Sequence, residues 1–484
     1  MITLLLLIFP ILAGLLLLFS INGKSKNVSI LAVSLGLTEF AISIWGLITY
    51  LKTPTSSLLD FKTSWIKDFS INFHLGWDGI STLMILLCTA LIALIALSII
   101  PIKYEHKNRL YALLFFTQAA LIGVFTAKDI FVFYFFFELA LIPVYLISNI
   151  WGGENSSKIT FKMLVYTVFG SLFMLVAFVL LYMRGQTSDI ESLKTTITLL
   201  PESIQNFLFW AFLLAFCIKM PVFPFHTWLP DTYSESPTPA TMLLSGLLSK
   251  MGVYGLIRIL LPFAPLGISS YAFGIIILSV FGLIYGSVIA IQQDSIKRLI
   301  AYSSFAHMGI MAGAVLTQSE IGVQGAIFQM VAHGFNVVGL FFVAKIIFER
   351  TGSRSLSALG GITQKAPMLS VAFMIILLGS VALPLTNGFV GEFLMLKSLF
   401  DFNAIIGSIA GLSIIFGAVY MLRFFQKTMF GPLNPENSEI KDLSQVELLV
   451  LIPIIAVILI TGLFPNIILD ISKPFVESLS LSIK

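Results

Sequence analysis

Apolar residues run through this 484-residue chain in stretches of about 20, with short polar segments between them. A helix of that length crosses the hydrocarbon core of a bilayer and satisfies its own backbone hydrogen bonds there. The pattern therefore predicts an all-α polytopic membrane protein with about 14 transmembrane helices. The expected helix centres are Leu12, Ser34, Leu91, Gln118, Glu138, Leu175, Leu214, Leu247, Ile276, Met308, Val331, Gly388, Ala418 and Ala456.

The composition supports this class and argues against others. The chain is 58% hydrophobic and 11% charged, with a mean hydropathy of +0.99, whereas soluble domains carry about 25% charged residues. Cys88 and Cys217 stand far apart, and the sequence has no Cys-x-x-Cys motif or Cys/His cluster, so we expect no iron–sulfur or zinc site. The net charge of +4 comes without a basic tract, so nothing indicates nucleic acid binding.

The basic residues between the predicted helices indicate an orientation. If the N-terminus is outside, the loops that lie inside hold most of these residues, among them Lys103, Lys107, Arg109 and Lys158. The positive-inside rule then predicts that both termini are outside. The apolar run Ile2–Phe19 lacks a basic start and an Ala-x-Ala site, so we interpret it as the first transmembrane helix rather than a signal peptide.

Two predicted helices are interrupted at corresponding places. The seventh breaks at Pro221 and the twelfth in Leu383–Gly388, and Pro384 follows Pro221 by 163 residues (384 − 221). The fourth and ninth helices begin near Leu110 and Tyr271, an offset of 161 residues (271 − 110). Prolines are common in membrane helices, so a chance offset is the alternative. Paired broken helices are nevertheless the best sequence pointer to an ion pathway.

These offsets predict four segments. Three N-terminal transmembrane helices in 1–109 precede a first five-helix repeat in 110–260 and a second in 271–425, and one C-terminal transmembrane helix follows in 426–484. Each repeat contains one broken helix. Because five is an odd number, the second repeat enters the membrane from the opposite side, which makes the repeats inverted.

Four ionisable residues lie near the middle of predicted helices: Glu138, Lys219, Lys250 and Glu392. A lysine at the centre of a membrane helix costs about 2.5–3.5 kcal/mol, so such charges usually mark ion paths. A hydrogen-bonded clasp between helices is the alternative for either glutamate. Lys345 and Lys397, which lie closer to helix ends, are better explained by snorkelling towards an interface.

Two histidines also lie on polar stripes. His307 follows Ser303 and Ser304 at i−4 and i−3, so these side chains share one helix face. His333 likewise has Gln329 at i−4 and Asn336 at i+3. Either histidine could instead be a packing residue with its hydrogen bonds satisfied.

Carboxylate and lysine together form a plausible proton switch. Burial disfavours the charged form of a lysine, and a nearby carboxylate favours it. A Glu138 that approaches or retreats would therefore make Lys219 hold or release its proton. Sodium sites need oxygen ligands, and a lysine would repel the cation, so the lysines favour protons as the transported ion.

Several long motifs resemble one family. They are Lys219–Asp231, Ser236–Thr238, Leu248–Arg258, Lys297–Gly309 and Gly388–Phe393. Together these motifs resemble the antiporter-like membrane subunits of respiratory complex I, and within that family the bacterial M-type branch, over nearly the whole chain. The resemblance implies 14 transmembrane helices and two inverted five-helix repeats.

The resemblance also implies roles for individual residues. Glu138 resembles the fifth-helix glutamate that pairs with the seventh-helix lysine, here Lys219. Lys250 resembles the eighth-helix lysine of a central polar axis, which the family continues through histidines that His307 and His333 resemble. The glutamate at 392 resembles the twelfth-helix proton-releasing site of the M-type branch, where sister subunits tend to carry lysine. Two departures are Tyr233, where the family often has histidine, and Lys397, which is unexpected beside this site.

The function implied is that of a proton-translocating subunit in the membrane arm of NADH:quinone oxidoreductase, driven by quinone reduction elsewhere in the complex. The chain itself would bind no cofactor: no NADH, flavin or quinone. Its partners would be protons, the lipid bilayer and other membrane-arm subunits, including the antiporter-like L and N, in a bacterial inner membrane with both termini periplasmic. Two alternatives are a subunit of a multisubunit cation/proton antiporter and a scaffold that only docks neighbouring subunits.

Overall fold

The computed structural model describes residues 1–20, 25–432 and 440–483. In this part of the chain, 12 helices are long and apolar enough to cross a membrane, and Ile2–Leu18 and Pro367–Ser380 are shorter apolar helices. All the predicted centres fall within helices. The prediction of an all-α polytopic membrane protein is therefore confirmed. Contacts divide the chain into two compact units, which are described in turn.

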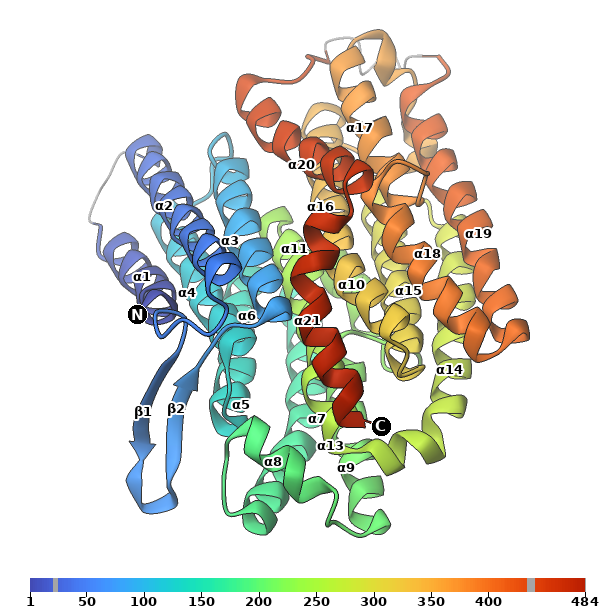
Figure 1. Cartoon of the computed structure of the whole chain (residues 1–484). Helices are drawn as coiled ribbons and strands as arrows, with labels where there is room; N and C mark the ends of the chain where they lie inside the picture. The colour runs from blue at the N-terminus through green and yellow to red at the C-terminus, as the bar shows by residue number, and fades with distance from the viewer. Residues whose placement is uncertain (21–24, 433–439, 484) are drawn as a thin grey trace. The chain divides into compact units, whose positions relative to one another are not determined.

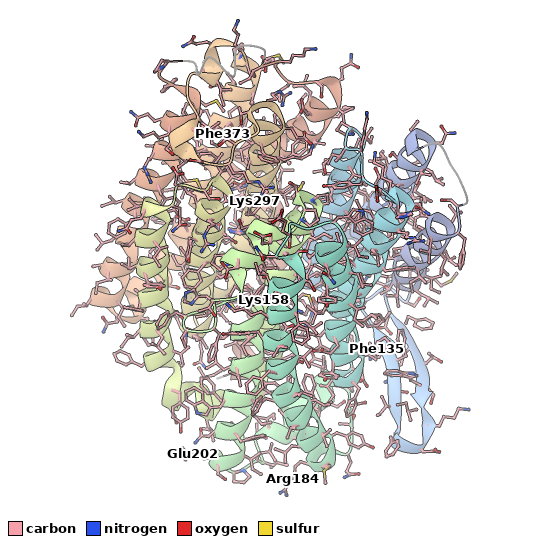
Figure 2. All side chains as sticks on the ribbon, turned by 180° about the vertical axis from the view of Figure 1, so that it is seen from behind. Phe135, Lys158, Arg184, Glu202, Lys297 and Phe373 are labelled. Carbon is pink, nitrogen blue, oxygen red and sulfur yellow. The ribbon has the colours of Figure 1, made fainter. Side chains whose placement is uncertain are left out.

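The first unit comprises Met1–Met220, Leu247–Phe273 and Asp470–Lys484. Within it, α1 packs against α4, α2 against α3, and α7 against α9 (Figure 1). Arg184 and Glu202 lie at the same end of the α7–α9 pair, as Figure 2 shows. Its first nine helices are α1 (Ile2–Leu18), α2 (Ser25–Lys52), α3 (Gly79–Ile99), α4 (Lys107–Thr126), α5 (Ile130–Leu139), α6 (Leu141–Ile150), α7 (Ser156–Gly185), α8 (Ile190–Ile197) and α9 (Glu202–Lys219).

The eighth predicted helix is irregular. It alternates α and π segments: α11 (Thr238–Leu243), the π segment η2 (Leu244–Leu248), α12 (Ser249–Gly255), the π segment η3 (Leu256–Leu260) and α13 (Leu261–Phe263). Wider π turns inside a helix occur frequently at functional sites. Both α12 and η3 pack against α9 in the first unit, so this irregular stretch lies beside the end of a broken helix.

An antiparallel hairpin joins α2 to α3. Strands β1 (Phe61–Ile66) and β2 (Ile71–Leu75) pair with Phe61 opposite Leu75, and the 3₁₀ turn η1 (Lys67–Phe69) connects them. Trp65 packs on Phe135 of α5 with ring centres 5.9 Å apart, and Figure 2 shows Phe135 beside the hairpin. The sequence pattern did not predict this sheet, because strands of five or six residues do not form apolar runs of about 20 residues.

A buried ionic network ties the hairpin end of the first unit together. Asp78 caps α3 and pairs with Lys128 at 2.7 Å and with Arg258 of η3 at 2.5 Å. Despite its burial, these two cations hold the pKa of the Asp78 carboxyl far below its usual range. Phe475 of α21 (Asn466–Ile483) lies 4.9 Å from the Arg258 guanidinium. α21 is a further element that was not predicted.

The second unit comprises Pro221–Gly246 and Gly274–Leu469. Here α16 lies against α15, α17, α18 and α20 and so forms the centre of the unit. Its remaining elements are α10 (Leu229–Glu235), most of α14 (Pro265–Gln292), α15 (Ile296–Leu316), α16 (Glu320–Thr351), the 3₁₀ turns η4 (Leu356–Ala358) and η5 (Ile362–Gln364), α17 (Pro367–Ser380), α18 (Asn387–Phe402), α19 (Ala404–Met429) and α20 (Gln445–Leu463).

Both predicted helix breaks are present. α9 ends at Lys219, since Pro221 lacks the N–H that the next helical turn requires. α17 ends at Ser380 and α18 begins at Asn387, with Pro384 between them. The inverted relation of the repeats and the four segment boundaries stay predictions.

Candidate functional site

The first candidate cluster centres on Lys219, the last residue of α9. Its side chain is only 4% exposed. The unpaired carbonyls at the end of α9 carry partial negative charge, which stabilises a cation in the last turn by about 0.3–1 kcal/mol, or up to ~2 kcal/mol when partly buried. The ammonium also lies 4.8 Å from the centre of the Phe137 ring, an attractive cation–π contact. A helix end and an aromatic face therefore support this buried charge.

Glu138 follows Phe137 on α5, two residues before the short interruption at Ala140 that separates α5 from α6. Its carboxylate is near enough to Lys219 to interact electrostatically. Among the residues that the structure describes, the two form no direct salt bridge. Glu138 instead lines an apolar groove between the hairpin, α5 and α7, together with Trp65 and Tyr182. The two residues are therefore neighbours without a direct ion pair.

Lys250 lies in the same unit, on α12 between the two π segments. It is completely buried, and its ammonium is 3.4 Å from Ser249 Oγ. Gly252 lets α12 approach the end of α9, because a Cβ there would stand 2.6 Å from Met220 Cβ and 2.7 Å from the Phe216 carbonyl oxygen. The glycine thus brings the helix of Lys250 against the turn that ends in Lys219.

The second cluster centres on a bond between His307 of α15 and Glu392 of α18. His307 Nε2 lies 2.7 Å from Glu392 Oε1, and both side chains are buried. His307 Nδ1 lies 2.8 Å from the Ser303 carbonyl oxygen, which can only accept a hydrogen bond, so Nδ1 carries a hydrogen. The contact between Nε2 and Oε1 then requires a second proton. That proton makes either an imidazolium–carboxylate pair or a neutral imidazole–carboxylic acid pair.

His333 of α16 joins this cluster. Its ring centre lies 5.2 Å from that of His307, with 50° between the ring planes. Gly391 allows α18 to approach α16 closely, because a Cβ there would lie 2.3 Å from Gln329 Oε1. The structure thus brings together three predicted residues, His307, His333 and Glu392, from three separate helices.

Two hydrogen bonds from one side-chain amide bridge the break that precedes Glu392. Asn336, one turn after His333 on α16, donates through Nδ2 to the Gly379 carbonyl at 2.9 Å and to Asn387 Oδ1 at 3.0 Å. Gly379 belongs to α17 and Asn387 begins α18, so one amide holds both halves of the broken helix. The polar stripe on α16 therefore has both a structural member and a titratable one.

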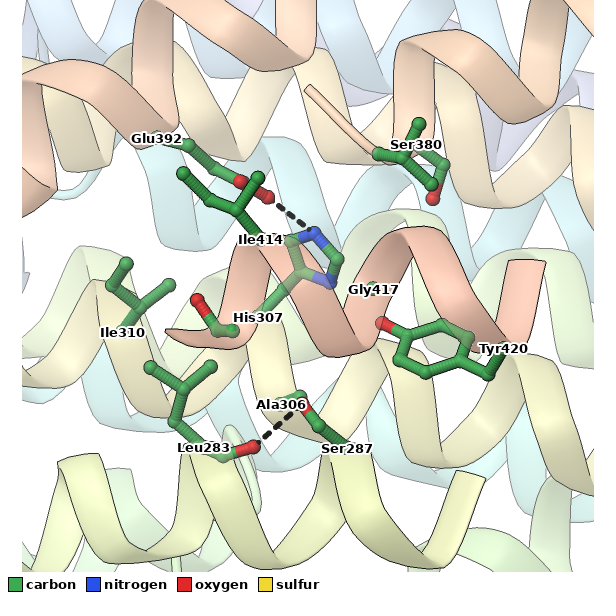
Figure 3. A pocket seen from close by; sticks show the side chains of 12 residues that line it. Leu283, Ser287, Ala306, His307, Ile310, Ser380, Glu392, Ile414, Gly417 and Tyr420 are labelled. Carbon is green, nitrogen blue, oxygen red and sulfur yellow. Dashed lines mark hydrogen bonds and ion pairs between the residues drawn. The ribbon is translucent and has the colours of Figure 1, made fainter. Parts of the chain in front are cut away.

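A small cavity adjoins the second cluster. It offers about 10 Å³ to the centre of a water molecule, which is room for roughly one water. Its walls include His307, Glu392, Ser287 and Tyr420, as Figure 3 shows. The Tyr420 hydroxyl of α19 lies 3.1 Å from Ser303 Oγ. The sequence pattern did not point to Tyr420, because a lone tyrosine in an apolar helix carries no signal.

Lys345 and Lys397 differ in their surroundings. Lys345 is buried and pairs with Glu349, one turn nearer the end of α16, at 3.1 Å; the snorkelling predicted for it stays a prediction. Lys397 is half-exposed and pairs with Asp401, with N–O distances of 2.6 and 2.7 Å. Five residues separate Lys397 from Glu392 on α18, which places the two on different faces of the helix. Lys397 is therefore a partner of Asp401.

Side chains that could act as metal ligands are not grouped in the described part of the chain. No group of three or more His, Cys, Asp or Glu side chains there could hold a metal ion. Cys88 and Cys217 are buried free thiols. The chemistry that the two clusters offer is proton binding and transfer.

Comparison with known proteins agrees with this geometry. Residues 127–417 match the family described as NADH:quinone oxidoreductase/Mrp antiporter, transmembrane region. NADH-quinone oxidoreductase subunit M of Rickettsia prowazekii is 38% identical over 468 residues, which cover 96% of this chain and 95% of that protein. This chain belongs to the NADH:quinone oxidoreductase/Mrp antiporter family.

Solved structures of this family share the fold. A chain of respiratory complex I from Thermus thermophilus with bound NADH superposes with a TM-score of 0.92 at 30% identity, over 100% of both chains. A chain of the Mrp complex from Dietzia superposes with a TM-score of 0.84 at 18% identity, over 100% of this chain and 52% of the other. The second likeness shows the fold alone, so the complex I branch of the family is favoured.

Proposed function

We propose that this chain is a proton-translocating, antiporter-like subunit in the membrane arm of an NADH:quinone oxidoreductase. The observation that carries the proposal is the buried bond between His307 and Glu392. Since Nδ1 of His307 is committed to the Ser303 carbonyl, the 2.7 Å contact holds one exchangeable proton between imidazole and carboxylate. A site that holds a single shared proton inside a membrane protein suits proton transfer.

The Lys219–Glu138 cluster supplies the part that responds to a signal. Lys219 is supported by a helix end and the Phe137 ring, and no salt bridge to Glu138 forms among the described residues. Movement of α5 at its interruption after Leu139 would change the distance between the carboxylate and the ammonium. A retreat of Glu138 favours release of the lysine proton, and an approach favours uptake.

The order of transfer completes the proposal. A signal from quinone reduction elsewhere in the complex changes the Glu138–Lys219 distance, and a proton then passes by way of Lys250, His307 and His333 to Glu392. The chain needs no cofactor of its own for this task. Other membrane-arm subunits, including the antiporter-like L and N, would flank it in a bacterial inner membrane with both termini periplasmic.

The competing proposal is a subunit of a multisubunit cation/proton antiporter, for which the Mrp-type fold likeness speaks. It is less favoured because the likeness at 18% identity supports only the fold. Relatives at 38% and 37% identity are subunits M of NADH-quinone oxidoreductases. The buried lysines also disfavour sodium, since an ammonium repels a cation where oxygen ligands are needed.

The test replaces Lys219 with alanine, and separately Glu138 with glutamine, in the assembled complex reconstituted into vesicles. We expect both variants to lose most coupled NADH:quinone turnover and proton uptake. A matched control is the surface pair Lys194 and Glu191, whose nitrogen and oxygen lie 2.8 Å apart. Lys194→Ala and Glu191→Gln should leave both rates unchanged. Normal pumping by the Lys219 and Glu138 variants would make that pair structural.

A further inference from the structure

A carboxylate outside both clusters lies buried in α2. Buried residues of this helix follow one another at alternating spacings of three and four. This spacing places them on one helix face, which packs against neighbouring helices. The residues of this face are Ser29, Ala32, Gly36, Glu39, Ser43, Gly46 and Tyr50, all of them buried. Glu39 is its only acidic member, and the side chain is completely inaccessible to solvent.

Contacts above and below fix where Glu39 lies. A Cβ added to Gly36 would lie 3.3 Å from Ala93 Cα, so α2 and α3 nearly touch at that level. One turn beyond Glu39, Ser43 Oγ lies 2.8 Å from Thr89 Oγ1. Glu39 is therefore enclosed between two close α2–α3 contacts, in the middle of the helical span. Neither of its carboxylate oxygens has a hydrogen-bond partner in the described residues.

A second unsatisfied side chain lies on α4. Gln118 is completely buried, and both its amide nitrogen and its amide oxygen lack partners among the described residues. Two turns earlier on the same face, Tyr111 donates to the Ala96 carbonyl of α3 at 3.2 Å and also meets Ser29 of α2. That face of α4 is thus directed at the α2–α3 seam. Figure 1 shows α2, α3 and α4 side by side.

Among the residues that the structure describes, the elements around this seam offer Glu39 no countercharge. Cys88 of α3 is the titratable group within its electrostatic reach, and Tyr111 is the next on the facing side of α4. The helix α1, which also packs on α2, carries no titratable side chain. Buried polar groups without protein partners are satisfied by ordered water or by a proton. An apolar residue of the same shape would avoid the cost of taking a carboxyl group out of water. What the carboxyl adds is a group that can bind and release a proton.

We propose that Glu39 is a further proton-binding site of this chain, whose carboxyl shares a bound water with the Gln118 amide and exchanges its proton during turnover. The site adjoins the first cluster through α4. Gly123, about 7 Å further along α4 than Gln118, touches α5: a Cβ there would lie 2.2 Å from the Phe136 ring, and Glu138 is two residues on. The inference that Glu39 exchanges its proton during turnover rests on the proposed function. The inference that its carboxyl is protonated does not.

The test compares the wild-type complex in vesicles with Glu39→Gln by infrared difference spectroscopy, in H₂O and in D₂O. We expect a protonated-carboxyl C=O band that shifts in D₂O, is missing in Glu39→Gln and persists in the exposed control Glu191→Gln. Gln118→Leu should retain the band at a higher frequency, because the water loses a partner. A wild-type spectrum without a Glu39-dependent band would overturn the proposal.

Pumping gives the second readout. Glu39→Gln should change the pH profile of proton uptake, and an unchanged profile would contradict the exchange. If Glu39→Gln fails to assemble, Glu39→Asp retains the carboxyl, and its complex should show the band at a shifted frequency. An assembled Glu39→Asp complex without the band also overturns the proposal. Should the Lys219 variant pump normally while the Glu39 band is present, the Lys219–Glu138 switch of the proposed function fails and the proton-binding site at Glu39 stands.

Discussion

The bond between His307 and Glu392 makes a sharp prediction, because two substitutions at one position separate its geometry from its proton. Glu392→Gln keeps the length of the side chain and can still donate a hydrogen bond to Nε2 of His307. It cannot hold the shared proton. Glu392→Ala removes both the hydrogen bond and the proton, and leaves a buried imidazole facing the small cavity.

The magnitudes follow from the burial of both side chains. A hydrogen bond to a charged group contributes about 1.5–3 kcal/mol and a neutral one about 0.5–1.5 kcal/mol. Glu392→Gln should therefore destabilise the second unit by roughly 1–2 kcal/mol. Glu392→Ala should cost about 3–5 kcal/mol, as expected when one partner of a buried pair is removed. Thermal unfolding midpoints should fall in the order wild type, glutamine variant, alanine variant.

Pumping should not follow this order. Both variants lack the titratable group, so both should lose proton translocation to a similar extent although their stabilities differ by about 2–3 kcal/mol. The assay is proton uptake per NADH oxidised by the complex in vesicles. Asp401→Asn is a matched control, since Asp401 is a half-exposed carboxylate on the same helix. Wild-type pumping by the glutamine variant would refute the shared proton, and so would a graded loss that parallels stability.

Three further predictions concern the framework. Asn336→Leu should destabilise the complex by about 2–3 kcal/mol in thermal unfolding, because the Gly379 carbonyl and the Asn387 side chain lose their hydrogen-bond donor. An unchanged unfolding midpoint would show that these two hydrogen bonds do not hold the broken helix together. Gly252→Ala should cost about 1–3 kcal/mol by overpacking, whereas Gly274→Ala, whose Cβ meets nothing within 4 Å, should be neutral in the same assay. The pKa of His74 is raised by its hydrogen bond to Asp189 and by Asp60, so its stabilisation of the hairpin is complete below about pH 6.5 and is lost as the pH rises through the raised pKa. The protection factors of the β2 amides against hydrogen exchange should fall over that range in the wild type and stay flat in His74→Gln.

Local chemistry determined which parts of the site were predictable. Pro221 and Pro384 interrupt helices through their missing N–H groups, and both breaks could be placed from the sequence. The charge of Lys219 stood out because a membrane helix rarely carries one. The partnership of His307 with Glu392 was not predictable in this way, since 85 residues separate them (392 − 307) and only the packing of α15 and α18 brings them together.

Other features leave no mark on the length of the apolar runs. The hairpin lies between two long apolar runs, and its strands are only six and five residues long. Glu39 was passed over although it is an acid within an apolar helix, the same signal that singled out Glu138 and Glu392. Tyr420 and Asn336 act through neighbours from other helices. Contacts of that kind follow from tertiary packing, which a hydropathy pattern does not encode.

The two breaks also explain why one cluster uses a lysine and the other a glutamate. Lys219 is the last residue of α9, where the carbonyl ends of the helix favour a cation. The N-terminal end of α18 favours an anion, but this effect fades within the first turn, and Glu392 lies in the second turn after Thr386. The helix backbone thus favours a positive charge at position 219, but it favours a negative charge at position 392 only weakly. At position 392 the partner His307 determines the sign, because a lysine there would face an imidazole whose Nδ1 already donates to Ser303 and which would have to stay neutral to accept its proton.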